Sequence, residues 1–191
     1  MSAALLALED VGCFRGGRIL FEGLSLALRP GQAAIVTGPN GVGKSSLLRI
    51  CAGLLAPLSG HVARNASAAL ASEALALDEE LPLARALHFW ARLDGKGTDE
   101  VGSALAAMGI AALADVPVRL LSTGQRRRGA IARLIAGGAP IWLLDEPANG
   151  LDAAALDALA MVLAGHRASG GVVLAASHQP LGLDEARTVE L

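Results

Sequence analysis

Residues 38–46 read Gly-Pro-Asn-Gly-Val-Gly-Lys-Ser-Ser, and the first eight fit the pattern G-x-x-x-x-G-K-[ST] of a phosphate-binding loop. Glycines let backbone N–H groups turn inward around a β-phosphate, and the helix that follows presents its N-terminus to the anion. In such a loop the lysine reaches the terminal phosphates and the next hydroxyl completes the coordination of Mg²⁺. The pattern predicts that nucleotide phosphates and Mg²⁺ bind here, through Gly38, Pro39, Asn40, Gly41, Val42, Gly43, Lys44, Ser45 and Ser46.

The use of lysine supports this interpretation. Lys44 and Lys96 are the only two lysines among sixteen basic residues. A chain that otherwise favours arginine keeps a compact ammonium at position 44, where a planar guanidinium would not fit the loop.

An apolar run of strand length, Ile141–Leu144, leads directly into two acids, Asp145 and Glu146. Because ligands of an open parallel sheet lie at the carboxyl ends of its strands, we expect Asp145 beside the phosphates, holding Mg²⁺ together with Ser45. Glu146 is then placed to polarise an attacking water. Phosphoryl transfer depends on positioning and charge neutralisation, so Lys44 and Glu146 are predicted to be catalytic. The alternative is an acid pair that only caps a helix.

A second glycine-bearing segment, Leu121–Arg128, reads Leu-Ser-Thr-Gly-Gln-Arg-Arg-Arg. A serine and a glycine that open a helix make an anion site from backbone N–H groups and the helix dipole. One nucleotide does not need two such sites from one chain. The arrangement therefore predicts a two-fold dimer in which the second loop of each chain completes the nucleotide site of the other.

These motifs lie on alternating strands and helices, which predict an α/β fold with a parallel-centred sheet. Before the phosphate loop, two alternating or apolar runs around Arg15-Gly16-Gly17 indicate antiparallel strands, and an Ala/Leu-rich stretch from Ser67 to Val116 indicates a helical insertion. We predict a single domain, 1–191, with a catalytic core of about 1–66 and 120–191 and a helical subdomain of about 67–119.

The composition and charge of the chain exclude several classes of protein and of binding partner. The chain of 191 residues is 53% hydrophobic, which excludes disorder as its main character, and its net charge of −2 argues against nucleic acid or an anionic bilayer as a direct partner. No apolar run approaches the roughly 18 residues of a spanning helix, and residues 1–12 lack the basic start of a signal peptide. Cys13 and Cys51 lack metal-ligand spacing, so both are expected to be small core or near-surface residues with free thiols.

In combination these motifs resemble the ATP-binding cassette (ABC) family of transporter ATPases over essentially the whole chain. The resemblance implies the ABC-type core of phosphate-loop NTPases, with an N-terminal antiparallel β subdomain and an inserted α-helical subdomain. It also implies that Ser122, Gly124 and Gln125 contact the terminal phosphate held by the partner chain. By the same resemblance Asp152 lies in the loop that crosses the dimer interface, and His178 is a catalytic switch histidine at the γ-phosphate. His61, His88 and His166 are expected to be structural.

Three positions depart from or test the family pattern. Thr123 replaces the first glycine of Leu-Ser-Gly-Gly-Gln, which adds a side chain beside the phosphate-contacting backbone. Phe14 stands where the family stacks an aromatic ring on adenine, although a phenyl ring there could equally fill the core. The glutamine that links Mg²⁺ to the helical insertion is not evident, and Glu73 either replaces it or leaves the link absent.

A narrower resemblance joins the chain to the ATPase subunits of cytochrome c maturation systems. It rests on Arg15–Phe21, Leu87–Leu93, Pro147–Asp152 and Ser177–Leu181. It implies an ATPase that serves heme export or release of a heme-loaded chaperone, as a peripheral protein on the cytoplasmic face of a bacterial inner membrane with integral membrane subunits as partners. The alternatives are an ABC ATPase for another cargo and an ATP-gated module with little turnover.

Two further segments allow a structural or a functional interpretation. Leu87–Leu93 either packs in the core of the helical insertion or forms a groove for a coupling helix of a membrane subunit. Arg126–Arg128 are a solvated helix face, or they raise the local positive potential beside the second loop, or they pair with acids around Asp78–Glu80.

Overall fold

The computed structural model describes residues 3–72 and 76–191. Its first part is a three-stranded antiparallel sheet in the order β2-β1-β4, built from β1 (Leu6–Arg15), β2 (Arg18–Leu28) and β4 (Ser59–Arg64). The turn between β1 and β2 is Gly16-Gly17, and both residues have positive φ, 60° and 78°, which glycine adopts without steric cost. The antiparallel N-terminal part predicted from the sequence is confirmed.

A five-stranded parallel sheet in the order β5-β6-β7-β3-β8 forms the centre of the molecule. Its central strands are buried on both faces, so their sequences are almost continuously apolar. In β6, Ile141 and Leu143 join one core, and Trp142 and Leu144 join the core on the opposite face. The strands are β3 (Ala33–Thr37), β5 (Ala68–Ala71), β6 (Ile141–Asp145), β7 (Val172–Ala176) and β8 (Arg187–Glu190).

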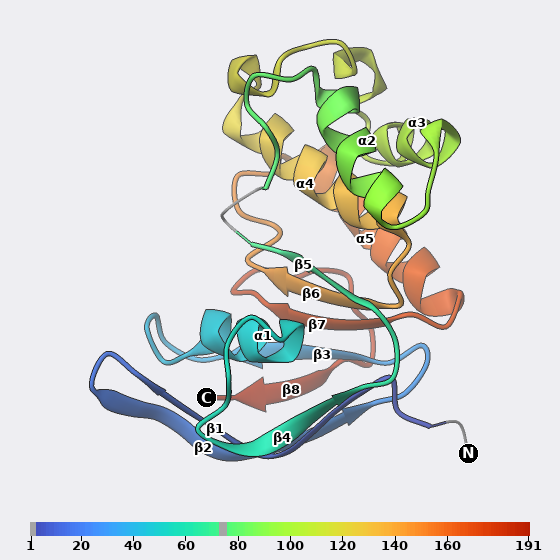
Figure 1. Cartoon of the computed structure of the whole chain (residues 1–191). Coiled ribbons are helices and arrows are strands. Elements are labelled where there is room, and N and C mark those ends of the chain that lie inside the picture. The colour runs from blue at the N-terminus through green and yellow to red at the C-terminus, as the bar shows by residue number, and fades with distance from the viewer. Residues whose placement is uncertain (1–2, 73–75) are drawn as a thin grey trace.

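Figure 1 shows the layers that result. Helix α1 lies between the antiparallel and the parallel sheet, and α4 and α5 cover the other face of the parallel sheet, with α2 and α3 beyond them. The order of elements and layers confirms the predicted α/β fold with a parallel-centred sheet. The helices are α1 (Lys44–Ala52), α2 (Leu83–Leu93), α3 (Thr98–Ala107), α4 (Thr123–Gly137) and α5 (Ala153–Ala168), with short 3₁₀ turns η1 (Ala111–Leu113) and η2 (Val118–Leu120).

The sequence predicts that the helical insertion begins at Ser67, and this boundary is wrong. Ala68–Ala71 form strand β5, which pairs in parallel with β6, and the first helix after it begins at Leu83. Alanine and leucine favour helices locally, and pairing with β6 overrides that preference. The guanidinium of Arg133 in α4 also donates to the Leu70 carbonyl and so fixes the edge strand. Strand β8, with only Val189 buried, gave no signal strong enough to be predicted.

Both cysteines are free and buried in the core between α1 and the two sheets, as the sequence predicted. Burial raises the pKa of the Cys51 thiol to about 12, so this side chain stays protonated and unreactive. Among the residues that the structure describes, no helix combines the length and the apolar character needed to cross a bilayer.

Candidate functional site

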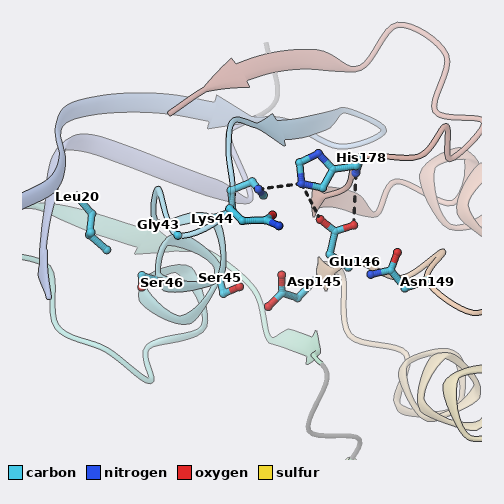
Figure 2. A pocket seen from close by; sticks show the side chains of 11 residues that line it. Leu20, Gly43, Lys44, Ser45, Ser46, Asp145, Glu146, Asn149 and His178 are labelled. Carbon is cyan, nitrogen blue, oxygen red and sulfur yellow. Dashed lines mark hydrogen bonds and ion pairs between the residues drawn. The ribbon is translucent and has the colours of Figure 1, made fainter. Parts of the chain in front are cut away.

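The phosphate loop (residues 38–46) and the ends of β6 and β7 enclose one pocket of about 450 Å³, shown in Figure 2. The loop follows β3 and runs into α1, while the two neighbouring strands deliver their last residues to the same edge of the sheet. This is the carboxyl edge at which open α/β sheets bind ligands. The lining residues are Leu20, Asn40, Gly41, Gly43, Lys44, Ser45, Ser46, Asp145, Glu146, Asn149 and His178.

Lys44 is the buried cation of this pocket. Its Nζ donates to the carbonyl oxygens of Gly38 at 2.7 Å and Pro39 at 3.2 Å, and it lies 3.1 Å from Nε2 of His178. An ammonium can only donate, so in this contact the ring nitrogen of His178 accepts from Lys44. The phosphate loop therefore holds its lysine inside the pocket, within reach of an incoming anion.

Glu146 and His178 face each other across the mouth of the pocket (Figure 2). Nε2 of His178 lies 3.5 Å from Oε1 of Glu146, and the backbone N–H of His178 points to Oε2 at 3.4 Å. Glu146 has φ of 47°, an unfavourable left-handed conformation for a residue with a side chain, and its N–H donates to the Ala176 carbonyl. The bond to β7 helps to hold the strained residue, so its carboxylate is fixed where β6 ends.

Two oxygen donors in the pocket suit Mg²⁺. Asp145, the last residue of β6, is buried, and Figure 2 shows its carboxylate facing the hydroxyl of Ser45 at the start of α1. Mg²⁺ prefers hard oxygen ligands and takes few from the protein, with the rest from phosphates and water. The residues present therefore fit a magnesium ion bound together with a nucleotide.

The second loop (residues 121–125) lies outside this pocket. Ser122 caps α4 reciprocally: the N–H of Gln125 donates to its Oγ at 3.2 Å, and its own N–H donates to Oε1 of Gln125 at 2.8 Å. Ser122 is exposed. Because the hydroxyl accepts from Gln125, its proton is free to be donated outward, and the N-terminus of α4 adds a favourable field for an anion. The chain thus exposes the capped N-terminus of α4 at a surface away from its own phosphate loop.

Gly124 and Asp152 connect the second loop to the turn after β6. A Cβ at Gly124 would lie 2.7 Å from the carbonyl oxygen of Gly150, so only glycine allows α4 to begin this close to the turn. Asp152 caps α5, with Oδ1 accepting from the N–H of Ala155 at 2.8 Å. The turn between Glu146 and Asp152 thus touches the pocket on one side and the second loop on the other.

The remaining site residues lie at the edges of this arrangement. Phe14 is 54% exposed on β1, paired across the strands with Ile19, and is not a lining residue of the pocket. Pro39 and Val42 line a smaller hollow that adjoins the pocket. Thr123 is exposed at the first position of α4, where its side chain has room. The expectation for Glu73 lies outside the described residues. Phe14 as an adenine platform therefore stays a prediction.

Two lining residues, Leu20 and Asn149, had no role assigned from the sequence. Leu20 comes from β2 of the other sheet, a contact that depends on the tertiary fold. Asn149 sits between Pro147 and Gly150, and its position three residues after Glu146 was a signal that could have identified it.

The arginines of α4 mostly serve the scaffold. Nη1 of Arg126 lies 3.5 Å from Glu79, the pairing that the sequence offered as one alternative. Arg127 is buried and donates to the Ser72 carbonyl at 3.3 Å. Arg133 stacks over the ring of Trp90, and burial lowers the pKa of its guanidinium. These contacts tie the helix that begins at the second loop to the sheet edge.

His166 has the structural role that was expected. Its ring stacks on Trp142 with centroids 3.8 Å apart, and its Nε2 lies 3.3 Å from the Val172 carbonyl. Burial lowers the pKa of this histidine below its ordinary value of 6.5, so the ring is neutral at pH 7.

Comparison with known proteins places this geometry in a family. The family model described as ABC transporter matches residues 21–149. The chain is 59% identical over 181 residues to the cytochrome c biogenesis ATP-binding export protein CcmA of Sphingopyxis alaskensis, covering 95% of this chain and 93% of that protein. It is 51% identical over 186 residues to the protein of the same name from Novosphingobium aromaticivorans, with coverage of 97% and 95%.

Solved structures agree on the fold. A metal-chelate type ABC transporter in an inward-facing conformation superposes with a TM-score of 0.82 at 26% identity, covering 100% of this chain and 80% of that one. An ABC transporter ATP-binding protein from Pyrococcus furiosus gives 0.84 at 22% identity, with coverage of 97% and 96%, which shows the fold alone. With its phosphate loop, acid pair and second loop in the family's order, the chain belongs to the ABC transporter family as one of its ATP-binding, ATP-hydrolysing subunits.

Proposed function

We propose that this ATPase works in a membrane complex for maturation of c-type cytochromes, in heme export or in release of a heme-loaded chaperone. The cargo rests on relatives named as cytochrome c biogenesis ATP-binding export proteins, at 59% and 51% identity over nearly the whole chain. The chemistry rests on one observation above all: Lys44, Glu146 and His178 converge in one pocket, while Ser122 of the same chain lies outside it.

The pocket residues support hydrolysis of ATP as follows. Backbone N–H groups of the phosphate loop and Nζ of Lys44 bind the β- and γ-phosphates, and Phe14 is proposed to stack on the adenine. Ser45 and Asp145 would hold Mg²⁺, which neutralises charge on the phosphate oxygens when bound. Glu146 orients a water for in-line attack on the γ-phosphorus, and the bond from this phosphorus to the bridging oxygen of ADP breaks. His178 donates toward the γ-phosphate once Lys44 has turned to the phosphates.

A second copy of the chain is proposed to complete each pocket. The exposed Ser122, with its hydroxyl proton free, and the start of α4 would contact the γ-phosphate held by the partner, and Asp152 lies in the turn that crosses between the two chains. Gly124 and Gln125 keep Ser122 in place. When two chains enclose two nucleotides, the phosphate loop and the second loop of each chain both contact a phosphate. In a monomer the second loop would have no nucleotide to contact.

A membrane subunit is proposed to dock at α2. Its inner face, including Leu87 and Ala91, is core, whereas Phe89 is 58% exposed and lines an apolar pocket of about 450 Å³. Trp90 closes the pocket by donating from Nε1 to the Ala76 carbonyl at 2.6 Å. Core packing thus accounts for the inner face of Leu87–Leu93, and docking is proposed for the outer face. Through this contact the chain would sit on the cytoplasmic face of the inner membrane without entering the bilayer.

The test of catalysis is steady-state phosphate release by the assembled complex. We expect turnover that Glu146→Gln abolishes while ATP binding persists, because only the group that orients water is lost. Equal rates for the wild type and Glu146→Gln would leave an ATP-gated module with little turnover as the better description.

The test of the partner is co-purification from membranes. Phe89→Ser should separate the chain from its integral membrane subunits without loss of ATP binding, and Met161→Ser, a control at a 76% exposed apolar side chain on α5, should not. A membrane partner that also binds a heme chaperone would support the proposed cargo. Membrane subunits specific for another cargo would contradict it.

A further inference from the structure

The phosphate loop packs against strand β2 of the other sheet. Leu20 and Phe21 pack so closely on Gly43 that a Cβ there would lie 3.2 Å from the Leu20 Cβ and 3.0 Å from the Phe21 ring. Two residues earlier on the same strand, Nη2 of Arg18 donates to the carbonyl oxygen of Gly41 at 3.1 Å. The start of β2 therefore touches two of the loop's glycines.

Arg18 reaches across a hollow between the start of β2 and the phosphate loop. A space of about 240 Å³ separates Arg18, Ile19 and Leu20 from residues 39–42. Leu20, Asn40 and Gly41 line both this hollow and the nucleotide pocket, so the two spaces adjoin at these residues. Figure 1 shows the turn between β1 and β2 at the same end of the molecule as the loop between β3 and α1.

The bond from Arg18 matters at Gly41 because a glycine backbone can adopt many conformations and the bond favours one of them. It has φ of 80°, in the region that glycine enters freely, and it is exposed. A loop that binds phosphates through backbone N–H groups loses affinity if these groups must first be ordered, whereas a loop held in place does not.

We infer that Arg18 is a positioning residue, which holds residues 39–41 in the conformation that binds nucleotide phosphates. The inference rests on the proposed binding of phosphates by residues 38–46. The side chain contacts the loop through the Gly41 carbonyl and does not line the nucleotide pocket, so its removal changes nucleotide affinity and leaves the attacking water, Lys44 and Glu146 unaffected.

The chain offers a matched control. Arg15 is the direct cross-strand partner of Arg18, is equally exposed and carries the same charge on the same turn. Removal of either arginine lowers the local positive charge equally, but only removal of Arg18 breaks the bond to Gly41.

The experiment measures affinity for Mg·ADP and Mg·ATP by calorimetry on the full chain, with KM and kcat in the assembled complex. Arg18→Ala should weaken both nucleotides alike by about two- to fivefold, the loss of one exposed hydrogen bond, and raise KM with kcat unchanged. Arg15→Ala should bind like the wild type, and Arg18→Lys should recover at least half of the lost affinity in free-energy terms, since a lysine can still donate to the carbonyl.

Equal affinities for Arg18→Ala and Arg15→Ala, or a fall in kcat at unchanged KM, would overturn the inference. So would a failure of Arg18→Lys to recover affinity. Failure of the wild type to bind ADP would instead contradict the proposed function, so the two failures are distinguishable.

Discussion

Replacing Gly124 by alanine tests the contact between the second loop and the turn after β6. The new Cβ would lie 2.7 Å from the carbonyl oxygen of Gly150, whereas ordinary contact begins at 3.4 Å, so helix and turn must separate by about 0.7 Å. The atoms that the methyl group would meet are the carbonyl oxygen and carbon of Gly150, and backbone atoms cannot rotate away as a side chain can. Overpacking of this kind costs about 1–3 kcal/mol, which corresponds to a fall of about 2–12 °C in Tm for a domain of this size.

The control is Gly102→Ala in α3, where nothing lies within 4 Å of the added methyl group. Alanine stabilises an exposed helix interior by up to about 1 kcal/mol relative to glycine, so this variant should be as stable as the wild type or more so. Urea and thermal unfolding of the three proteins give the comparison. If Gly124→Ala unfolds at the same temperature and urea concentration as the wild type, the contact does not constrain the loop and the reasoning fails.

Three other perturbations follow from the structure. Lys44→Arg should lower ATP affinity at least tenfold in a calorimetric titration, because a planar guanidinium does not fit among the Gly38 and Pro39 carbonyls and His178; wild-type affinity would contradict this. Native protein should react with less than one equivalent of a thiol reagent at pH 8 and with two in denaturant, since Cys13 and Cys51 are buried and the pKa of Cys51 is about 12; fast reaction of the native form would refute it. Below pH 6.5 the unfolded chain protonates His166 before the folded chain does, because its folded pKa is lowered. The free energy of unfolding should thus fall from pH 7.5 to 5.5, and less steeply in His166→Phe; parallel slopes would exclude this histidine as a cause.

The parts predicted well from the sequence depend on short stretches of chain. The phosphate loop needs glycines at set spacing between a strand and a helix, and residues 33–52 provide both within twenty positions. Ile141–Asp145 is apolar on both faces and then acidic, which defines a central strand and its functional end together. In each case the local pattern and the tertiary environment agree.

The parts that were missed depend on contacts between distant segments. Ala68–Ala71 carry no β-branched or aromatic residue and become a strand only by pairing with β6 about seventy residues later. The bond from Arg18 to Gly41 joins strand β2 to the phosphate loop across 23 residues, and nothing around Arg18 distinguishes it from Arg15 in the sequence. The contact of Gly124 with Gly150 likewise follows only from how α4 meets the turn after β6. Such pairs have no periodicity by which they could be recognised.

The central claim, that a second chain completes the nucleotide site, is tested most directly by cross-linking between two singly labelled proteins. One carries Asn40→Cys in the phosphate loop and the other Ser122→Cys in the second loop, each in the Glu146→Gln background, and the buried native cysteines stay silent. Mixed with Mg·ATP and a short bifunctional maleimide, the two should form a covalent heterodimer that is absent without nucleotide. Absence of this product while both proteins bind ATP would contradict the account.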